Sequence, residues 1–95
     1  MKTYMLTVTY TAKAGCAKKY VEELEASGVA DAVRQEDGCL GYDYYFSAKD
    51  ESTVFLFEEW ESQQHQQVHL TQPHMATLKA IKEKYILDTK LRILE

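Results

Sequence analysis

Alternation of apolar and polar residues at four places predicts four β-strands. In residues 3–10, two tyrosines, a leucine and a valine alternate with threonines and a methionine. The same period of two occurs in residues 39–47, in residues 54–60 and in the closing segment 85–95. Because successive side chains of a strand point to opposite faces, this period is typical of strands, and β-branched and aromatic residues favour them further.

The segments between these strands have helical spacing. After the first strand, apolar residues recur every three or four positions from Ala17, with lysines and glutamates between them. The pair Ser27-Gly28 weakens this helix and predicts a bend or break, and Gly38 is expected to end it, because glycine adopts the left-handed conformation without strain. The pattern also predicts two more helical segments, in residues 61–70 and 71–84. They are separated near Pro73, because proline suits the first turn of a helix and not its interior.

The order of elements predicts the fold class. Strand, helix, two strands, helix and strand form the ferredoxin-like β-α-β-β-α-β arrangement, an α+β fold in which one antiparallel sheet carries its helices on one face. The length of 95 residues suits one domain, which we expect to span residues 1–95.

Large apolar residues occupy both sides of the two middle strands. In the second strand, Leu40, Tyr42, Tyr44 and Phe46 share one side. In the third strand, two phenylalanines point one way, while a valine, a leucine and Trp60 point the other. Because helices cover only one face, we expect the other face to pack against a second copy of the chain in a homodimer.

Charge and composition exclude several classes of protein. A net charge of −4 without a concentrated basic face argues against nucleic-acid binding. The sequence contains neither a signal-peptide pattern nor a run near the ~20 apolar residues of a membrane span, so we expect a cytoplasmic protein that does not bind membranes. The two cysteines, Cys16 and Cys39, are too few for a disulfide framework and are expected to be reduced thiols.

The segments EDGCLGY, FEEWES, HQQVHLTQPHM and LRIL together resemble the antibiotic biosynthesis monooxygenase family, and in particular its branch of small quinol monooxygenases. The resemblance spans nearly the whole chain and is densest over residues 36–75. It implies a dimeric α+β barrel of ferredoxin-like subunits. It also implies oxidation of a small electron-rich aromatic, such as a hydroquinone or an anthrone, by molecular oxygen. The resemblance further implies that this reaction uses no metal, flavin or haem cofactor.

Three histidines are the candidate catalytic residues. His65 and His69 are four positions apart, on one face of the helix after the third strand, and His74 begins the next helix. The resemblance places family histidines at His69 and His74, and in the quinol branch at His65. A phenolate donates an electron to oxygen far more readily than a neutral phenol, so a base that acts near neutral pH suits this chemistry. We expect His69 to be the base with His74 and His65 as partners, although helical histidines are also common as surface or hydrogen-bonded groups.

Aromatic residues are the candidate substrate contacts. Trp60, Tyr44 and Tyr42 are the candidates to line the pocket, although a place in the core is the commoner one for such residues. Asp43 and Glu58 are expected to be polar contacts or solvated charges at the rim of the sheet.

The sequence gives little support for a metal. A histidine pair at HxxxH spacing provides two ligands, and Glu58 or Glu59 would add a carboxylate. The HExxH signature is absent, because Gln66 occupies the position of its glutamate. We therefore expect no metal.

Two alternative functions remain open from the sequence. A histidine that transfers protons would also suit a non-redox isomerase of a small carbonyl metabolite in the same pocket. A protein that binds haem or another small ligand without turnover is the other alternative. Haem-degrading relatives use an asparagine in the first strand, where this chain offers Thr3, Thr7 and Thr9.

Overall fold

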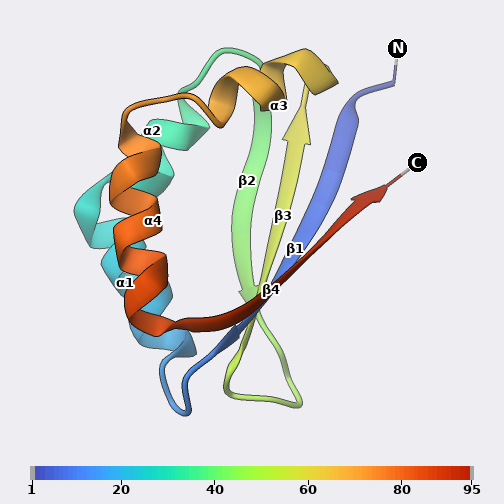
Figure 1. Cartoon of the computed structure of the whole chain (residues 1–95). Coiled ribbons are helices and arrows are strands. Elements are labelled where there is room, and N and C mark those ends of the chain that lie inside the picture. Colours follow the sequence, from blue (N-terminus) through green and yellow to red (C-terminus); the bar gives the residue numbers. More distant parts are fainter. Residues whose placement is uncertain (1, 95) are drawn as a thin grey trace.

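A computed structural model describes residues 2–94 as a four-stranded antiparallel sheet with helices on one face (Figure 1). The elements follow the chain as β1 (Tyr4–Ala12), α1 (Ala17–Ser27), α2 (Val29–Arg34), β2 (Cys39–Phe46), β3 (Thr53–Trp60), α3 (Gln63–His69), α4 (His74–Tyr85) and β4 (Ile86–Leu94). The strand order is β2-β3-β1-β4, and each neighbouring pair is antiparallel. The predicted ferredoxin-like α+β fold is confirmed.

Among the residues that the structure describes, three glycines between β1 and β2 adopt the left-handed conformation, and two of them, Gly28 and Gly38, are the positions where the sequence predicts a break and an end of the helix. Gly28 has φ +83° and separates α1 from α2, which confirms the predicted break in the first helix. Gly38 has φ +81°, but it does not end the helix as expected. The helix α2 ends at Arg34, and residues 35–38 form a turn that leads into β2.

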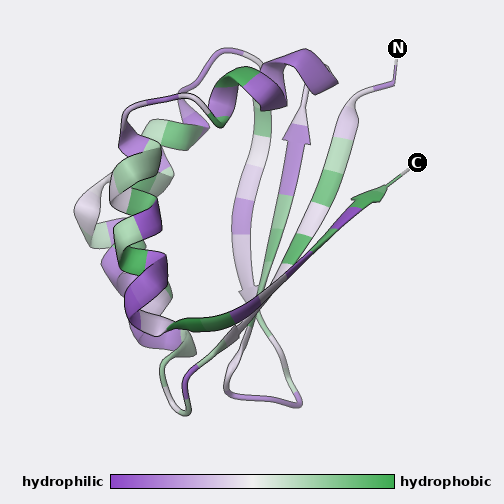
Figure 2. Ribbon diagram, viewed as in Figure 1, coloured by the Kyte–Doolittle hydropathy of each residue, from purple (hydrophilic) through white to green (hydrophobic). Residues whose placement is uncertain are grey.

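The core lies between the sheet and the helices. The register of β1 and β3 pairs Leu6 with Glu58 and Val8 with Leu56 on the face that the helices cover. In Figure 2 the ribbon of β1 alternates between hydrophobic and pale residues, whereas α3 is mostly hydrophilic. The largest side chains that are fully buried are Trp60, Tyr20, Leu6, Leu24, Leu56, Val33 and Val54.

A β-bulge at the start of β2 corrects one expectation about this strand. Cys39 pairs with Trp60 and Gly41 pairs with Glu59, so the register shifts between them. Leu40 is the extra residue on its strand and is 53% exposed, rather than sharing the buried face with Tyr42. A sequence pattern with a strict period of two cannot show this shift.

The face of the sheet away from the helices carries aromatic residues on β2 and β3 and basic residues on β4. Tyr45, Phe55 and Phe57 alternate with the core positions of β2 and β3, and Phe55 and Tyr45 are exposed. On β4, Lys90 and Arg92 pair with threonines of β1 that lie on this same face. Among the helices described, none is both long and apolar enough to cross a bilayer.

Gly28 and Gly38 make a matched pair for a stability test. A Cβ added to Gly28 has no atom within 4 Å, whereas a Cβ on Gly38 would collide with the ring of His65. We expect Gly28→Ala to lower the free energy of unfolding by about 1–2 kcal/mol through backbone strain alone. Gly38→Ala should lower it further, because the collision adds to the same strain. Urea unfolding of both variants measures this, and equal losses would contradict the collision.

Candidate functional site

One carboxylate, that of Glu36, contacts two histidines. The Nδ1 atom of His69 lies 2.9 Å from Oε2 of Glu36, and the Nε2 atom of His74 lies 2.6 Å from the same oxygen. The side chains of Glu36 and His69 are only 9% and 3% exposed. The result is a shielded group of one acid and two imidazoles, which we call the Glu36 cluster.

Three separate segments build this cluster. Glu36 lies in the turn between α2 and β2, where its own amide and carbonyl form hydrogen bonds with Val33 and Cys39. His69 is the last residue of α3, and His74 is the first residue of α4, next to Pro73 at its N-terminal cap. The sequence therefore brings the cluster together through a turn and two helix ends.

The carboxylate fixes which nitrogen of each ring carries a proton. A carboxylate only accepts hydrogen bonds, so Nδ1–H of His69 and Nε2–H of His74 are the donors. Within residues 2–94, the other nitrogen of His69, Nε2, has no hydrogen-bond partner. His69 is thus held by one nitrogen, while the other is free to accept a proton.

Aromatic rings surround His69 on its inner side. The ring of Trp60 lies 4.7 Å from the His69 ring, centroid to centroid, and Tyr42 makes an edge contact at 6.1 Å. The hydroxyls of Tyr42 and Tyr44 lie 3.0 Å apart. The structure therefore packs Trp60 and Tyr42, both buried, against His69, and Tyr44 contacts Tyr42.

The tyrosines beneath the helices are neutral phenols. Burial raises the pKa of Tyr42 and Tyr44 well above the usual range, so neither acts as a base near neutral pH. Tyr20 lies in edge contact with Tyr10 and Tyr44, at 5.5 and 6.4 Å. Its buried hydroxyl has no hydrogen-bond partner in the part of the chain that is described.

Glu58 is buried, and the expectation that it is a charge at the rim is wrong. Its side chain points into the core and accepts a hydrogen bond of 3.0 Å from Nε1 of Trp60. Burial raises the pKa of Glu58, while the bond from Trp60 and the nearby His69 act in the opposite direction. The sequence does indicate this burial, because Glu58 lies on the same face of the strand as Val54, Leu56 and Trp60.

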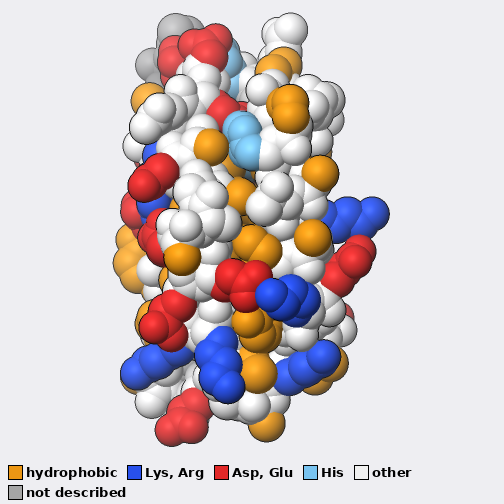
Figure 3. Space-filling model, turned by 90° about the vertical axis from the view of Figure 1, so that its left-hand side faces the viewer, with side chains coloured by type: hydrophobic (Ala, Val, Ile, Leu, Met, Phe, Trp, Pro, Cys, Tyr) orange, Lys and Arg blue, Asp and Glu red, His pale blue; other side chains and the backbone are white. Residues whose placement is uncertain are grey.

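His65 lies apart from the Glu36 cluster. Its Nδ1 is 2.7 Å from Oγ of Ser62, the N-terminal cap of α3. An open pocket of about 420 Å³ is lined by Glu36, Asp37, Gln64, His65, Val68 and Gln72. On the helix-covered side of the molecule, histidine atoms are visible beside acidic ones in the upper part (Figure 3). Glu36 is therefore the residue that both lines the pocket and binds His69.

Sequence reasoning did not identify Glu36. It stands in the EDGCLGY motif, but a turn has no periodicity that marks which of its side chains points inward. Only the folded chain shows that it lies opposite two histidines that are more than thirty positions away, at separations of 33 and 38 residues.

Comparisons with known proteins agree on one family. Residues 3–80 match the family described as Antibiotic biosynthesis monooxygenase. Probable quinol monooxygenase YgiN of Escherichia coli (strain K12) is 28% identical over 75 residues, which cover 70% of this chain and 72% of that protein.

Solved structures share the fold. The crystal structure of PA3566 from Pseudomonas aeruginosa has a TM-score of 0.85 at 26% identity, and the match covers 99% of this chain and 93% of that one. The structure of Rv0793 from Mycobacterium tuberculosis has a TM-score of 0.82 at 22% identity, with coverage of 99% and 94%.

Buried Glu58 gives a pH-dependent prediction. Because its pKa is raised in the folded state, the folded protein holds this proton to higher pH than the unfolded chain does. Stability therefore falls as the pH rises from the ordinary carboxyl range through the raised pKa. Glu58→Gln removes this fall, and its amide oxygen still accepts the bond from Trp60. The difference in Tm, variant minus wild type, should become more positive between about pH 4 and about pH 7.

The exposed variant Glu22→Gln controls for the loss of one negative charge. A Tm difference for Glu58→Gln that is constant with pH, or that follows the control, would show that Glu58 titrates as it does in the unfolded chain.

Proposed function

Because this chain belongs to the antibiotic biosynthesis monooxygenase family, we propose that it oxidises a small electron-rich aromatic, such as a quinol, with molecular oxygen and without a metal, flavin or haem. The family resemblance of its motifs is confirmed, and a relative named as a probable quinol monooxygenase supports the substrate class. The observation that carries the proposal is the Glu36 cluster, which holds His69 with one ring nitrogen free.

His69 is the base in this proposal. Its Nε2 takes the proton of a substrate hydroxyl, and the Glu36 carboxylate lies beside the imidazolium that forms. The phenolate then transfers electrons to oxygen. For a quinol, two electrons and two protons pass to O₂ and give the quinone and hydrogen peroxide. Insertion of oxygen would instead give a hydroxylated quinone and water, with the quinol itself supplying the four electrons that reduce O₂.

The remaining site residues have supporting roles. His74 shares the oxygen of Glu36 with His69 and completes the pairing of this buried charge. The pocket beside Glu36 and His65 is the proposed entry, because Glu36 joins it to His69. Trp60 and Tyr42, which pack on His69, and Tyr44, which contacts Tyr42, form the proposed aromatic wall, where a neutral tyrosine hydroxyl donates to a substrate oxygen.

We also propose that the chain forms a homodimer through the sheet face that carries no helices. Exposed aromatics on β2 and β3 supply an apolar area on that face. Asp43 and Glu59 lie on the same face near one edge, and Lys90 and Arg92 lie near the opposite edge. A second copy turned by a two-fold axis would pair the apolar areas and bring opposite charges together.

Oxygen uptake tests the catalytic proposal. A reduced naphthoquinone should consume oxygen faster with the wild-type protein than by its own autoxidation in buffer. His69→Ala should lower kcat/KM by about 10²-fold or more, the usual contribution of a general base. Glu36→Gln keeps the shape of the side chain but adds a donor in place of a carboxylate oxygen. Glu36→Gln should lower kcat/KM by about 10–100-fold, because His69 loses its orienting partner.

The exposed variant Glu22→Gln is the matched control for Glu36→Gln and should keep wild-type activity. Peroxide measured beside oxygen distinguishes oxidation from insertion of oxygen. The proposal fails if the wild type shows no uptake above autoxidation, or if folded His69→Ala is as active as the wild type.

Light scattering on the protein as it elutes from a size-exclusion column tests the proposed dimer. The wild type should have twice the mass of one chain. Phe55→Lys introduces a charge at an exposed position of the sheet face and should yield monomers of unchanged fold. Leu70→Lys introduces the same charge at an exposed apolar position beside α3, and this variant should stay dimeric. A monomeric wild type, or a dimer that Phe55→Lys leaves intact, would contradict the proposed interface.

A further inference from the structure

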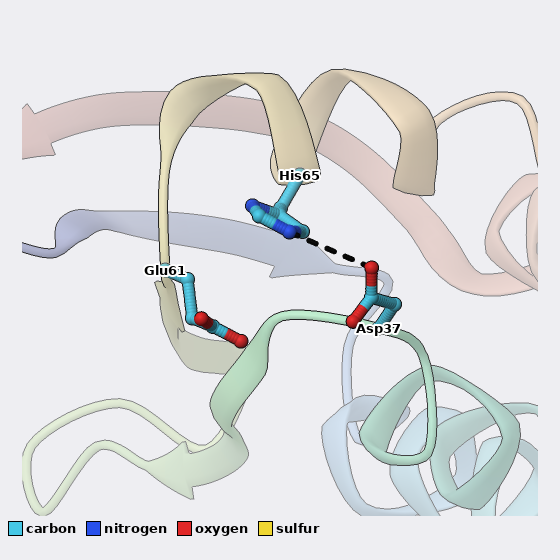
Figure 4. A group of neighbouring side chains, drawn as sticks. All are labelled: Asp37, Glu61 and His65. Carbon is cyan, nitrogen blue, oxygen red and sulfur yellow. Dashed lines mark ion pairs between the residues drawn. The ribbon is translucent and has the colours of Figure 1, made fainter.

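Three side chains of the types that bind metals in proteins lie close together beside the pocket, outside the Glu36 cluster. Asp37, Glu61 and His65 each offer one ligand atom, and these atoms all lie within 4.8 Å of one another (Figure 4). We propose that they bind a divalent cation of the first transition row, such as Zn²⁺ or Mn²⁺. The proposal does not depend on the oxidation of quinols.

The three residues come from three segments that are tied together. Asp37 lies in the turn before β2, Glu61 follows β3, and His65 is in α3. The amide of Glu61 donates a 2.8 Å hydrogen bond to the carbonyl of Gly38, which joins the two segments that carry the carboxylates. The ring of His65 lies against Gly38, where a side chain would displace it. The backbone therefore holds the three segments that carry these side chains together without an ion.

Ser62 orients the ring of His65. The Nδ1 atom of His65 lies 2.7 Å from Oγ of Ser62, and Nε2 lies 3.6 Å from Oδ2 of Asp37. When Nδ1–H donates to the serine, Nε2 carries the free electron pair on the side of the carboxylates. A histidine that binds a metal usually has its second nitrogen hydrogen-bonded in this way.

The distance between the Asp37 and His65 atoms suits an ion of this class. Nitrogen and oxygen ligands lie about 2.0–2.2 Å from Zn²⁺, so two ligands of one ion are separated by about 3–4.4 Å. The Asp37 and His65 atoms fall within this range at 3.6 Å. An imidazole with two carboxylates suits Zn²⁺ or Mn²⁺, and solvent in the adjoining pocket supplies further oxygen ligands.

The local charge also favours a cation. Within residues 2–94, neither Asp37 nor Glu61 forms an ion pair with a lysine or arginine, and His65 is the only ion-pair partner of Asp37. Figure 3 shows the lysines and arginines of the helix-covered side mainly in its lower half, away from the visible histidines. Two carboxylates without a strong basic partner leave negative charge that an ion would neutralise.

This site differs from the HxxxH pair of the sequence. His69 donates its Nδ1–H to Glu36 and packs on Trp60, so it is committed to another group. His65 instead faces Asp37. The proposed ligands thus come from a turn, the end of a strand and a helix, rather than from one helix face.

Calorimetry and NMR on chelator-treated protein test the site. Zn²⁺ should bind at one site per chain, and Asp37→Asn, Glu61→Gln and His65→Ala should each weaken it by about tenfold or more. Glu22→Gln removes an exposed charge on α1 and should leave the affinity unchanged. Mn²⁺ binds thiols poorly, so it excludes binding at Cys16 and Cys39, and it should broaden the amide signals around residues 37, 61 and 65 first.

Circular dichroism of each variant establishes that it is folded before its affinity is compared. The site is overturned if neither ion binds saturably, if any one of the three variants binds as tightly as the wild type, or if Mn²⁺ first broadens signals elsewhere. Because these measurements need no turnover, they stand apart from the oxygen-uptake test.

Discussion

The hydrogen bonds from two imidazoles to the Glu36 carboxylate join the three segments that form the candidate site. A carboxylate that is 9% exposed needs partners, because a charge removed from water without them is costly. His69 and His74 supply both bonds, and in doing so they fasten the end of α3 and the start of α4 to the turn before β2. His69 also packs on Trp60, and among residues 2–94 its second ring nitrogen has no hydrogen-bond partner. Structure and proposed chemistry thus depend on one acidic side chain.

The interior beneath the helices combines this charged group with neutral aromatic ones. Tyrosine hydroxyls remain protonated there because burial disfavours their ionised form. Glu58 is the second buried acid, and it is held by the indole of Trp60 rather than by a basic residue. Two carboxylates near one imidazole therefore lie in different surroundings, one paired with histidines and one whose pKa is raised by burial. Such a difference is a common basis for dividing acid and base roles among neighbouring groups.

Much of the fold could be predicted because its signals are local. Strand alternation, helical spacing and the break at Gly28 are each visible within a few residues of sequence. The bulge that exposes Leu40 could not be predicted, because it adds one residue to a strand whose pattern looks regular. Glu58 could have been placed in the core from its phase with its neighbours, but its charge favoured the surface. The histidines were predicted from a motif, whereas their shared partner Glu36 depends on contacts between distant segments, which no local pattern encodes.

The short connection between α3 and α4 has a consequence for how related sequences are compared. His69 and His74 reach the same oxygen of Glu36 from the two ends of this connection, so its length sets the distance between two ring nitrogens. A homologue with one residue inserted there would retain both histidines in an alignment and still lose one of the two bonds. The number of residues between the histidines is therefore as informative about an equivalent arrangement as the histidines themselves.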